Sequence, residues 1–514
     1  MATFSGTDAD ETITPSFVSP TVVATGGVAP GADGDILNGL GGNDTLDGGL
    51  GADNLFGGGG ADLVRGGDGN DTAFLGAGSD IFEWNPGDDN DLVEGDAGFD
   101  TLLFNGANVA ERFDVSANGS RIRFTRDVAN VTMDVNSIEQ IDLHALGGAD
   151  RITVNELTGT GVQQVNANLF ASGGIGDGAA DTVTVNGGAG NDVLSLSTGT
   201  AALVVVTGAE AGLDTVAVYG LAGMDAIVAG GFDFALTIDG GTESDTVSYA
   251  DATASVTVNL LTPAMNEGVA AKHSYVSIES VIGSAFEDFL IGTNESNTLD
   301  GGAGADYLQG LGGDDTYLVD NAGDTIIETT NGGLLDSVLA STSYTLTGPA
   351  HVEVLATVNA SSKASISLTG NVFSQTIIGN NGANKLSGKG GNDVLYGGKG
   401  NDTLDGGDGK DSFVFDTRLK ASNFDTIKHY VRPDDTIILD NDIFTALTST
   451  GKLTKSAFYA STSGSAHDFN DRILYDTDDG KLYYDKDGLA NGAAVHFATL
   501  SGHPTIGAND FVIV

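Results

Sequence analysis

The chain has 514 residues and a formal net charge of −50, because 71 Asp and Glu residues outnumber 21 Lys and Arg residues. This balance excludes nucleic acid and anionic membranes as partners, since both need a basic surface. Hydrophobic residues make up 40% of the chain, which excludes a disordered acidic protein.

Glycine and aspartate recur every nine residues near the N-terminus, as in "GGLGADNLFGGGGADLVRGGDGND" from Gly48 to Asp71. We number each nonapeptide so that the acidic residue is at position six. The unbroken copies begin at Pro30 and place apolar residues at position eight. Position six holds Asp35, Asp44, Asp53, Asp62, Asp71 and Asp80.

This spacing predicts stacked coils of two nonapeptides each. Glycines supply the positive φ angles of tight turns, and the residues after each Asp form a short strand with its middle residue inward. Position-six residues 18 apart then lie in neighbouring coils, about 5 Å from one another. Two carboxylates at that spacing repel by roughly 3 kcal/mol at an effective dielectric of 20. A divalent cation between them removes the repulsion, and oxygen ligands in flexible turns favour calcium.

Two further blocks follow the same nine-residue register. The second has Asp288, Asn297, Asp306 and Asp315 at position six, and the third has Asn384, Asp393, Asp402 and Asp411. The segment between the first two blocks alternates apolar and polar residues and contains degenerate turns with Asp150, Asp192, Asp225 and Asp245. We interpret it as irregular solenoid with a few calcium sites, Asp192 among them.

The repeats resemble those of RTX (haemolysin-type) calcium-binding proteins. The resemblance implies a right-handed parallel β-roll. Pairing position-six residues 18 apart gives roughly eight calcium ions, and more if the degenerate turns are counted. Three departures stand out. Asn297 and Asn384 lack a charge, so we expect their sites to be weaker. Pro30 and Asp33 make the first turn irregular, and the segment 84–94 is two residues too long, so we expect the first roll to be interrupted there.

The C-terminal region resembles that of RTX proteins exported by type I secretion, and the ending "DFVIV" is similar to the terminal motif of serralysin-type proteins. The chain has no cysteine, no apparent signal peptide and no apolar run long enough for a membrane span. We therefore expect a protein secreted by a Gram-negative bacterium, with the type I secretion machinery as a partner. An apolar edge strand is the alternative interpretation of the ending.

No zincin, nucleophile-elbow or P-loop motif occurs, so we predict no enzyme activity. The fold prediction is all-β: β-roll and β-solenoid blocks with a β-rich C-terminal domain. The predicted segments are an N-terminal RTX β-roll (1–103), an irregular β-solenoid (104–282), a second RTX block (283–320), a connecting β segment (321–378), a third RTX block (379–414) and a secretion region (415–514).

The sequence leaves three functions open. The first is a calcium-binding structural protein that folds outside the cell. Its first coil starts near Met1 without an obvious polar cap, so unpaired strand edges would let it self-assemble into a homo-oligomer, filament, surface layer or matrix. The second is an adhesin that binds carbohydrate or a host surface. The third is a polysaccharide-acting enzyme.

Overall fold

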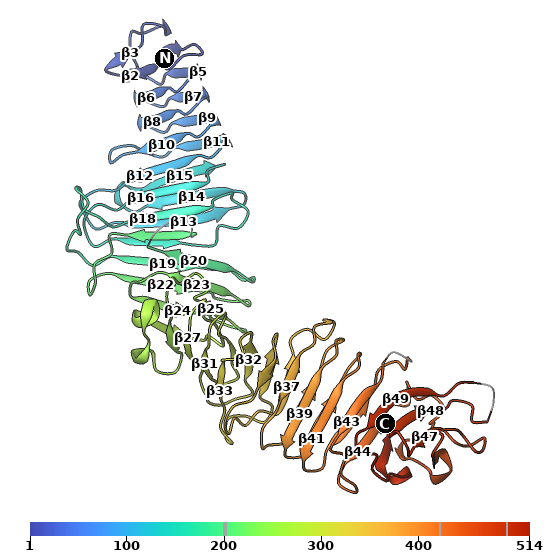
Figure 1. Ribbon diagram of the computed structural model, residues 1–514. Coiled ribbons are helices and arrows are strands. Elements are labelled where there is room, and N and C mark those ends of the chain that lie inside the picture. The colour runs from blue at the N-terminus through green and yellow to red at the C-terminus, as the bar shows by residue number, and fades with distance from the viewer. Residues whose placement is uncertain (199–202, 421–422, 490–491) are drawn as a thin grey trace. The chain divides into compact units, whose positions relative to one another are not determined.

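The protein is all-β, and long ladders of parallel strands run through it, which confirms the predicted fold class (Figure 1). This computed structural model describes residues 1–198, 203–420, 423–489 and 492–514. The described residues contain no α-helix. Their only helical elements are the 3-10 turns η1 (Val128–Asn130), η2 (Pro263–Met265), η3 (Gly268–Lys272), η4 (Lys455–Ala457) and η5 (Ala508–Asp510).

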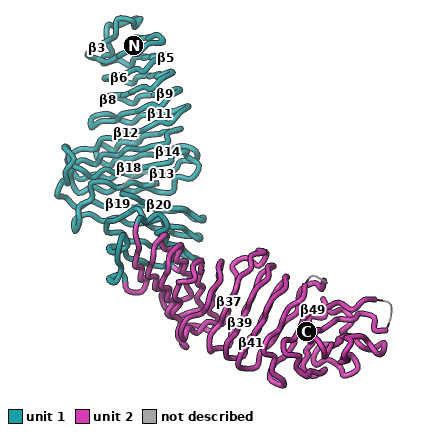
Figure 2. The backbone as a smooth tube through the Cα atoms, viewed as in Figure 1, with its two compact units in different colours: residues 1–253, 263–278 teal, residues 254–262, 279–514 magenta. Residues whose placement is uncertain are grey.

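The chain divides into two compact units (Figure 2). The first comprises Met1–Thr253 and Pro263–Ile278, and the second comprises Ala254–Thr262 and Glu279–Val514. Each unit is described by itself below. The limits of the six predicted segments stay a prediction.

Two sheets form the first unit. One sheet has the spatial order β4 (Val23–Thr25), β1 (Thr3–Ser5), β5 (Ile36–Gly41), β7 (Asn54–Gly59), β9 (Thr72–Gly78), β11 (Leu92–Gly98), β15 (Val131–Asn136), β14 (Arg121–Arg126), β13 (Arg112–Asn118), β17 (Arg151–Val154), β19 (Thr182–Asn186), β22 (Thr215–Tyr219), β24 (Leu236–Asp239) and β27 (His273–Val276). The other contains β3 (Phe17–Val18), β2 (Thr12–Thr14), β6 (Thr45–Leu50), β8 (Leu63–Asp68), β10 (Ile81–Trp84), β12 (Thr101–Asn105), β16 (Gln140–His144), β18 (Gln164–Asn168), β21 (Val204–Thr207), β20 (Val193–Ser197), β23 (Ala226–Gly231) and β25 (Thr246–Ser248).

Three ladders form the second unit. The first contains β26 (Thr257–Asn259), β29 (Phe289–Ile291), β31 (Tyr307–Gln309) and β33 (Thr325–Ile327). The second contains β28 (Ser280–Ile282), β30 (Thr298–Asp300), β32 (Thr316–Val319), β34 (Ser337–Ala340), β36 (Val354–Thr357), β38 (Thr376–Ile378), β40 (Val394–Tyr396), β42 (Ser412–Phe415), β44 (Thr436–Leu439), β50 (Phe511–Ile513) and β45 (Gly451–Lys452). The third contains β35 (Tyr344–Thr345), β37 (Ser367–Thr369), β39 (Lys385–Gly390), β41 (Thr403–Asp408), β43 (Asp425–Lys428), β49 (Val495–Leu500), β48 (Lys481–Tyr484), β47 (Ile473–Asp476) and β46 (Phe458–Ser461).

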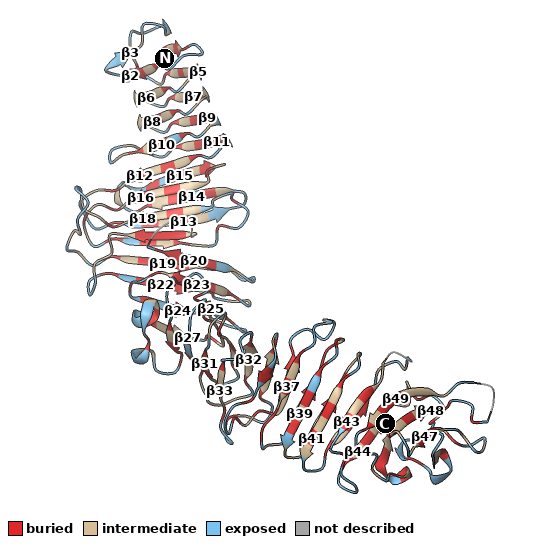
Figure 3. Ribbon diagram, in the orientation of Figure 1, coloured by how far each residue is buried: buried red, intermediate tan, exposed pale blue. Residues whose placement is uncertain are grey.

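The 18-residue coil predicted from the repeat is present in the strand register. Leu37 of β5 lies opposite Leu55 of β7, which lies opposite Ala73 of β9. All three side chains are fully buried, because position eight points inward in every coil. Buried and half-buried residues therefore alternate along the strands (Figure 3).

The first roll is not interrupted at residues 84–94, so that prediction is wrong. Leu92 of β11 pairs in parallel with Thr72 of β9, and the Asp71 N–H still reaches the Asp91 carboxylate at 2.9 Å. The two extra residues are held in a local turn, where the Asn85 N–H donates to Asp88. The ladder therefore passes the insertion with a 20-residue coil.

The predicted unpaired edges of the first coil are also absent. Residues 17–25 fold back so that β4 pairs antiparallel with β1 and β3 pairs antiparallel with β2. At the other end of the chain, β50 lies inside its sheet, parallel to β44 and antiparallel to β45. The apolar ending is therefore core: Phe511 and Ile513 are buried.

Candidate calcium-binding turns

Each position-six carboxylate is buried at a turn and ties two neighbouring coils together. The Asp35 N–H donates to Asp53 Oδ1 at 2.5 Å, and the Asp53 N–H donates to Asp71 Oδ1 at 2.7 Å. On the opposite edge, the Asp44 N–H donates to Asp62 Oδ1 at 2.8 Å. One carboxylate oxygen of each residue is thus used by the backbone of the preceding coil.

The second carboxylate oxygen divides the turns into two kinds. In the turns that we call open, Oδ2 is buried and has no hydrogen-bond partner among the described residues. In closed turns, the corresponding oxygen accepts the N–H of the residue at position two. The open turns are those of Asp44, Asp53, Asp62, Asp71, Asp80, Asp91, Asp100, Asp150, Asp225, Asp245, Asp306, Asp315, Asp336, Asp393, Asp402 and Asp411.

The unpartnered oxygen of an open turn converges with a backbone carbonyl. A Cβ built on Gly48 would overlap Asp53 Oδ2 and lie 2.6 Å from the Gly66 carbonyl oxygen of the next coil. The same arrangement recurs beside Gly39, where Asp44 Oδ2 approaches the Gly57 carbonyl. Two acceptors that face each other without a donor require a proton or a cation between them. Carboxylate and carbonyl oxygens are the ligands that calcium takes, so these turns fit that ion.

The backbone at position two decides which kind of turn forms. In 15 of the 16 open turns this residue has a positive φ, which directs its N–H away from the carboxylate; Asp336 is the exception. Six of these residues are not glycine: Leu40, Asp96, Leu146, Leu221, Leu311 and Lys389. A side chain in this conformation costs of order 1 kcal/mol, and such strain concentrates at functional sites.

In the closed turns, position two has no positive φ and its N–H reaches the carboxylate or amide. Gly31 donates to Asp35 Oδ2 at 3.0 Å, and Ser284 donates to Asp288 Oδ2 at 2.5 Å. Gly188 donates to Asp192 Oδ2 at 2.6 Å. These carboxylates are satisfied by the protein itself.

The two asparagine turns are closed in a second way. Asn384 accepts the Asn380 N–H through Oδ1 and donates through Nδ2 to the Ile366 carbonyl of the preceding coil at 3.3 Å. Asn297 donates in the same way to the Glu279 carbonyl at 3.1 Å. The amide supplies the hydrogen that a carboxylate lacks, so neither turn has an unpartnered oxygen.

Burial raises the pKa of several open-turn carboxylates. The pKa rises to about 6 for Asp53 and to about 7 for Asp71. Burial raises the pKa of Asp91 to about 8, against the opposing effect of the Asp71 N–H, and the negative charge of Asp71 adds to the rise. Without a cation, burial therefore disfavours the charged forms of Asp71 and Asp91 near neutral pH.

The predicted residues therefore fall into two groups. Asp44, Asp53, Asp62, Asp71, Asp80, Asp306, Asp315, Asp393, Asp402 and Asp411 lie in open turns. Asp35, Asp192, Asp288, Asn297 and Asn384 lie in closed turns. Sequence analysis did not single out Asp91, Asp100 and Asp336, which lie 20, 20 and 21 residues after Asp71, Asp80 and Asp315. A search that allowed coils longer than 18 residues would have found them.

One turn carries a third carboxylate. Asp315, Glu328 and Asp336 are all buried, and their carboxylates present oxygens within 4.8 Å of one another. Glu328 follows β33 at position one, where the regular repeats have glycine, and accepts the Tyr317 hydroxyl. This turn has the largest acidic cluster found among the described residues.

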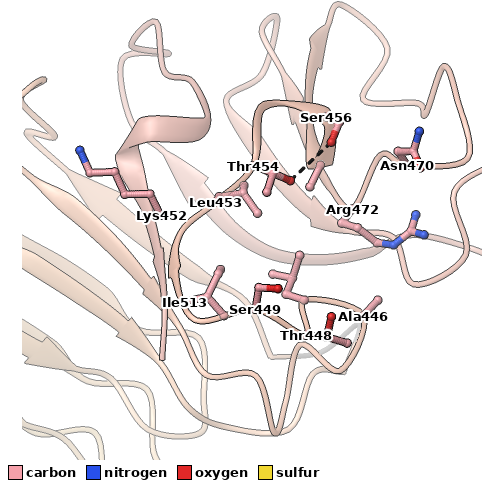
Figure 4. A pocket seen from close by; sticks show the side chains of 12 residues that line it. Ala446, Thr448, Ser449, Lys452, Leu453, Thr454, Ser456, Asn470, Arg472 and Ile513 are labelled. Atoms are coloured by element: carbon pink, nitrogen blue, oxygen red, sulfur yellow. Dashed lines mark hydrogen bonds between the residues drawn. The ribbon is translucent and has the colours of Figure 1, made fainter.

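A hollow in the C-terminal region lacks such chemistry. It has a volume of about 220 Å³ and is lined by hydroxyl, amide, basic and apolar side chains, with the Thr454 and Ser456 hydroxyls 3.5 Å apart (Figure 4). The charged ends of Lys452 and Arg472 point away from one another in Figure 4. In the described ranges, no helix is both long and apolar enough to cross a membrane.

Comparison with known proteins agrees with the geometry of the turns. The family model "RTX calcium-binding nonapeptide repeat (4 copies)" matches residues 31–64, 47–82, 175–200, 282–326 and 378–413. No curated protein matches the chain. The matched segments contain the turns with the most regular glycine and aspartate spacing. The chain therefore contains RTX calcium-binding nonapeptide repeats.

Proposed function

We propose that this protein is a secreted, calcium-binding structural protein whose solenoid folds when calcium binds outside the cell. The observation that carries the proposal is the set of buried Asp Oδ2 atoms without a hydrogen-bond partner. A buried unpaired acceptor costs about 1–3 kcal/mol. Repeated along the coils, this cost opposes folding until a cation is present.

The residues of the open turns have defined parts in this switch. The Oδ1 atom of Asp53 holds the preceding coil through the Asp35 N–H, and its Oδ2 atom faces the Gly66 carbonyl. The position-two residue keeps its N–H out of that space. Bound calcium would supply the positive charge that the facing oxygens lack. Because only the folded chain brings these oxygens together, calcium binding stabilises the fold.

The proposed export route follows the same logic. A chain with −50 charges and unfilled turns stays open at low calcium, which suits passage through a type I secretion channel. We therefore place the protein outside the cell and assign its C-terminal region the export signal. We assign the chain no enzymatic reaction.

Calcium counting tests the proposal. Equilibrium dialysis with atomic emission would give the number of ions bound to the chelator-stripped chain at pH 7.5. We expect more ions than the roughly eight counted from regular repeats alone, because the open turns extend beyond those repeats. Fewer than four ions would contradict the proposal, since the first block alone contains five open turns at predicted positions.

Self-assembly is the second part of the proposal, and the N-terminal cap changes where it would occur. The first coil is covered by β3 and β4, so the free sheet edge is the outer edge of β4, where Val23 is exposed. Sedimentation velocity in calcium, from micromolar to high concentration, tests this part. Growth of the sedimentation coefficient that is lost in Val23→Asp supports assembly through this edge. A monomer at all concentrations contradicts it.

A further inference from the structure

The basic residues of the first unit are concentrated in one place. Five of its seven Lys and Arg residues are arginines within residues 112–151. They lie on β13, β14 and β17, where β14 pairs antiparallel with both β13 and β15 between strands that are otherwise parallel to their neighbours. This coil is the irregular part of the solenoid, because Leu92 of β11 lies opposite Asp134 of β15, 42 residues further along the chain.

Two of the five arginines are already neutralised. Arg126 is buried, pairs with Glu111 and lies 5.2 Å from the centroid of the Trp84 ring. Arg121 pairs with Glu94 and Asp134. The guanidinium groups of these two residues are paired with carboxylates of the protein, so we do not assign them to ligand binding.

The other three arginines are exposed, and none of them forms an ion pair with a described residue. Arg112 and Arg151 lie directly opposite each other on adjacent parallel strands. Like charges in this position destabilise a sheet. Arg112 and Arg151 therefore place two positive charges close together, and a bound anion would reduce the repulsion between them.

These arginines line a hollow of about 470 Å³. Its other polar walls come from Thr125, Thr132 and Thr153, which can hydrogen-bond to hydroxyl groups. It also contains two carboxylates, each of which accepts a hydrogen bond: Asp114 accepts the Asn155 amide at 3.0 Å, and Asp127 accepts the Arg112 backbone N–H at 2.8 Å. The volume is in the range of small-ligand sites.

We propose that this hollow binds an acidic saccharide, with a carboxylate of the ligand between Arg112 and Arg151. Guanidinium groups bind carboxylates through paired hydrogen bonds, and the threonine hydroxyls match the hydroxyl groups of a sugar ring. A small ligand is favoured over a second copy of this chain, because the hollow of about 470 Å³ has the size of a small-ligand site. The site goes beyond the calcium switch and does not depend on its details.

Titration calorimetry of the full chain in calcium tests the site. The probe is the hyaluronan hexasaccharide, which carries glucuronate carboxylates, and the neutral control is hexa-N-acetylchitohexaose. We expect binding of the acidic probe only, weakened about tenfold or more by Arg112→Gln with Arg151→Gln and by less in the Lys variants, which keep the charge but lose the paired contact. Arg418→Gln, a matched change at an exposed, unpaired arginine of the second unit, should leave affinity unchanged.

Equal binding of both probes, no binding of either, or an unchanged affinity in the double Gln variant would overturn the proposal. If the double variant instead lowers the sedimentation coefficient and leaves saccharide affinity unchanged, the hollow binds a second copy of the chain. Circular dichroism in calcium must be the same for all variants, which separates failure of this site from failure of the calcium-dependent fold.

Discussion

Asp53 and Asn384 occupy equivalent positions in their coils, but the hydrogen bonding of their side chains differs. Asn384 completes its hydrogen bonds with its own amide, which donates to the Ile366 carbonyl. Asp53 leaves Oδ2 buried and without a hydrogen-bond partner, close to the Gly66 carbonyl oxygen. The Asn384 turn has all its side-chain oxygens hydrogen-bonded by the protein. The Asp53 turn needs a cation or a proton to satisfy its free carboxylate oxygen. We therefore expect some turns to depend on calcium and others not, although all of them follow the same repeat.

The largest expected effect is a reversal of pH dependence. Burial raises the pKa of open-turn carboxylates such as Asp71, to about 7, and Asp91, to about 8, well above the usual unfolded value of about 4. A raised folded-state pKa gives stability that is fully present below pH 4 and is lost as the pH rises through 7 to 8. Calcium-free protein should therefore be more stable at pH 4.5 than at pH 8.

Calcium-loaded protein should behave in the opposite way, because protons compete with the ion for the same oxygens. Urea unfolding followed by circular dichroism at both pH values, with chelator and with calcium, checks both signs. A metal-free protein that gains stability from pH 4.5 to pH 8 would show that the open turns are not protonated in the fold.

The next largest effect is the change in unfolding free energy when the glycine at position two is replaced by alanine in an open and in a closed turn. Gly67 in the open turn of Asp71 has a φ of +90°, and a Cβ there would overlap the Gly49 carbonyl. Gly67→Ala should lower the free energy of unfolding in calcium by about 3 kcal/mol, from the left-handed backbone and the overlap together.

Gly31 in the closed turn of Asp35 is the matched control. Its φ is not positive, nothing lies within 4 Å of a Cβ, and the alanine keeps the N–H that donates to Asp35. Gly31→Ala should change the unfolding free energy by less than about 0.5 kcal/mol. Equal losses for the two variants in urea unfolding would contradict the division into open and closed turns.

The smallest effect is the change in stability of the calcium-free chain when Asp is replaced by Asn, and we expect opposite signs for it in open and closed turns. Asp62→Asn removes a buried unpartnered oxygen and should raise the stability of the calcium-free chain by about 1–2 kcal/mol, while fewer calcium ions bind. Asp288→Asn removes an acceptor that Ser284 uses, so it should lower stability by about 1–2 kcal/mol and leave the ion count unchanged. Dialysis counts in calcium, together with folding curves of the calcium-free variants induced by an osmolyte at pH 7.5, give the two signs. The same sign for both in the absence of calcium would refute the comparison.

The nine-residue period predicted much of this structure. It gave the 18-residue register that stacks Leu37 on Leu55, and it placed ten carboxylates in open turns. It could not separate the turn of Asp35 from that of Asp53, because both have glycine at position two and only the backbone angle differs. Nor could it predict positive φ at Leu146 or Leu221, since leucine rarely adopts this conformation.

Other features depend on pairing that a periodic pattern does not encode. The cap of the first coil comes from β3 and β4, which are short, largely exposed and antiparallel, and have no nonapeptide signature. The arginines of the hollow are spread over residues 112–151 and meet only because β13 lies beside β17. Rigid counting in nines likewise missed Asp91 and Asp100 after the two-residue insertion.

The central claim is that the open turns require calcium for the fold at neutral pH. Its most direct test is far-ultraviolet circular dichroism of chelator-stripped protein at pH 7.5 during a calcium titration. The account predicts an unfolded spectrum in chelator and a cooperative gain of β signal as calcium is added. A full β spectrum in chelator, unchanged by calcium, would contradict it.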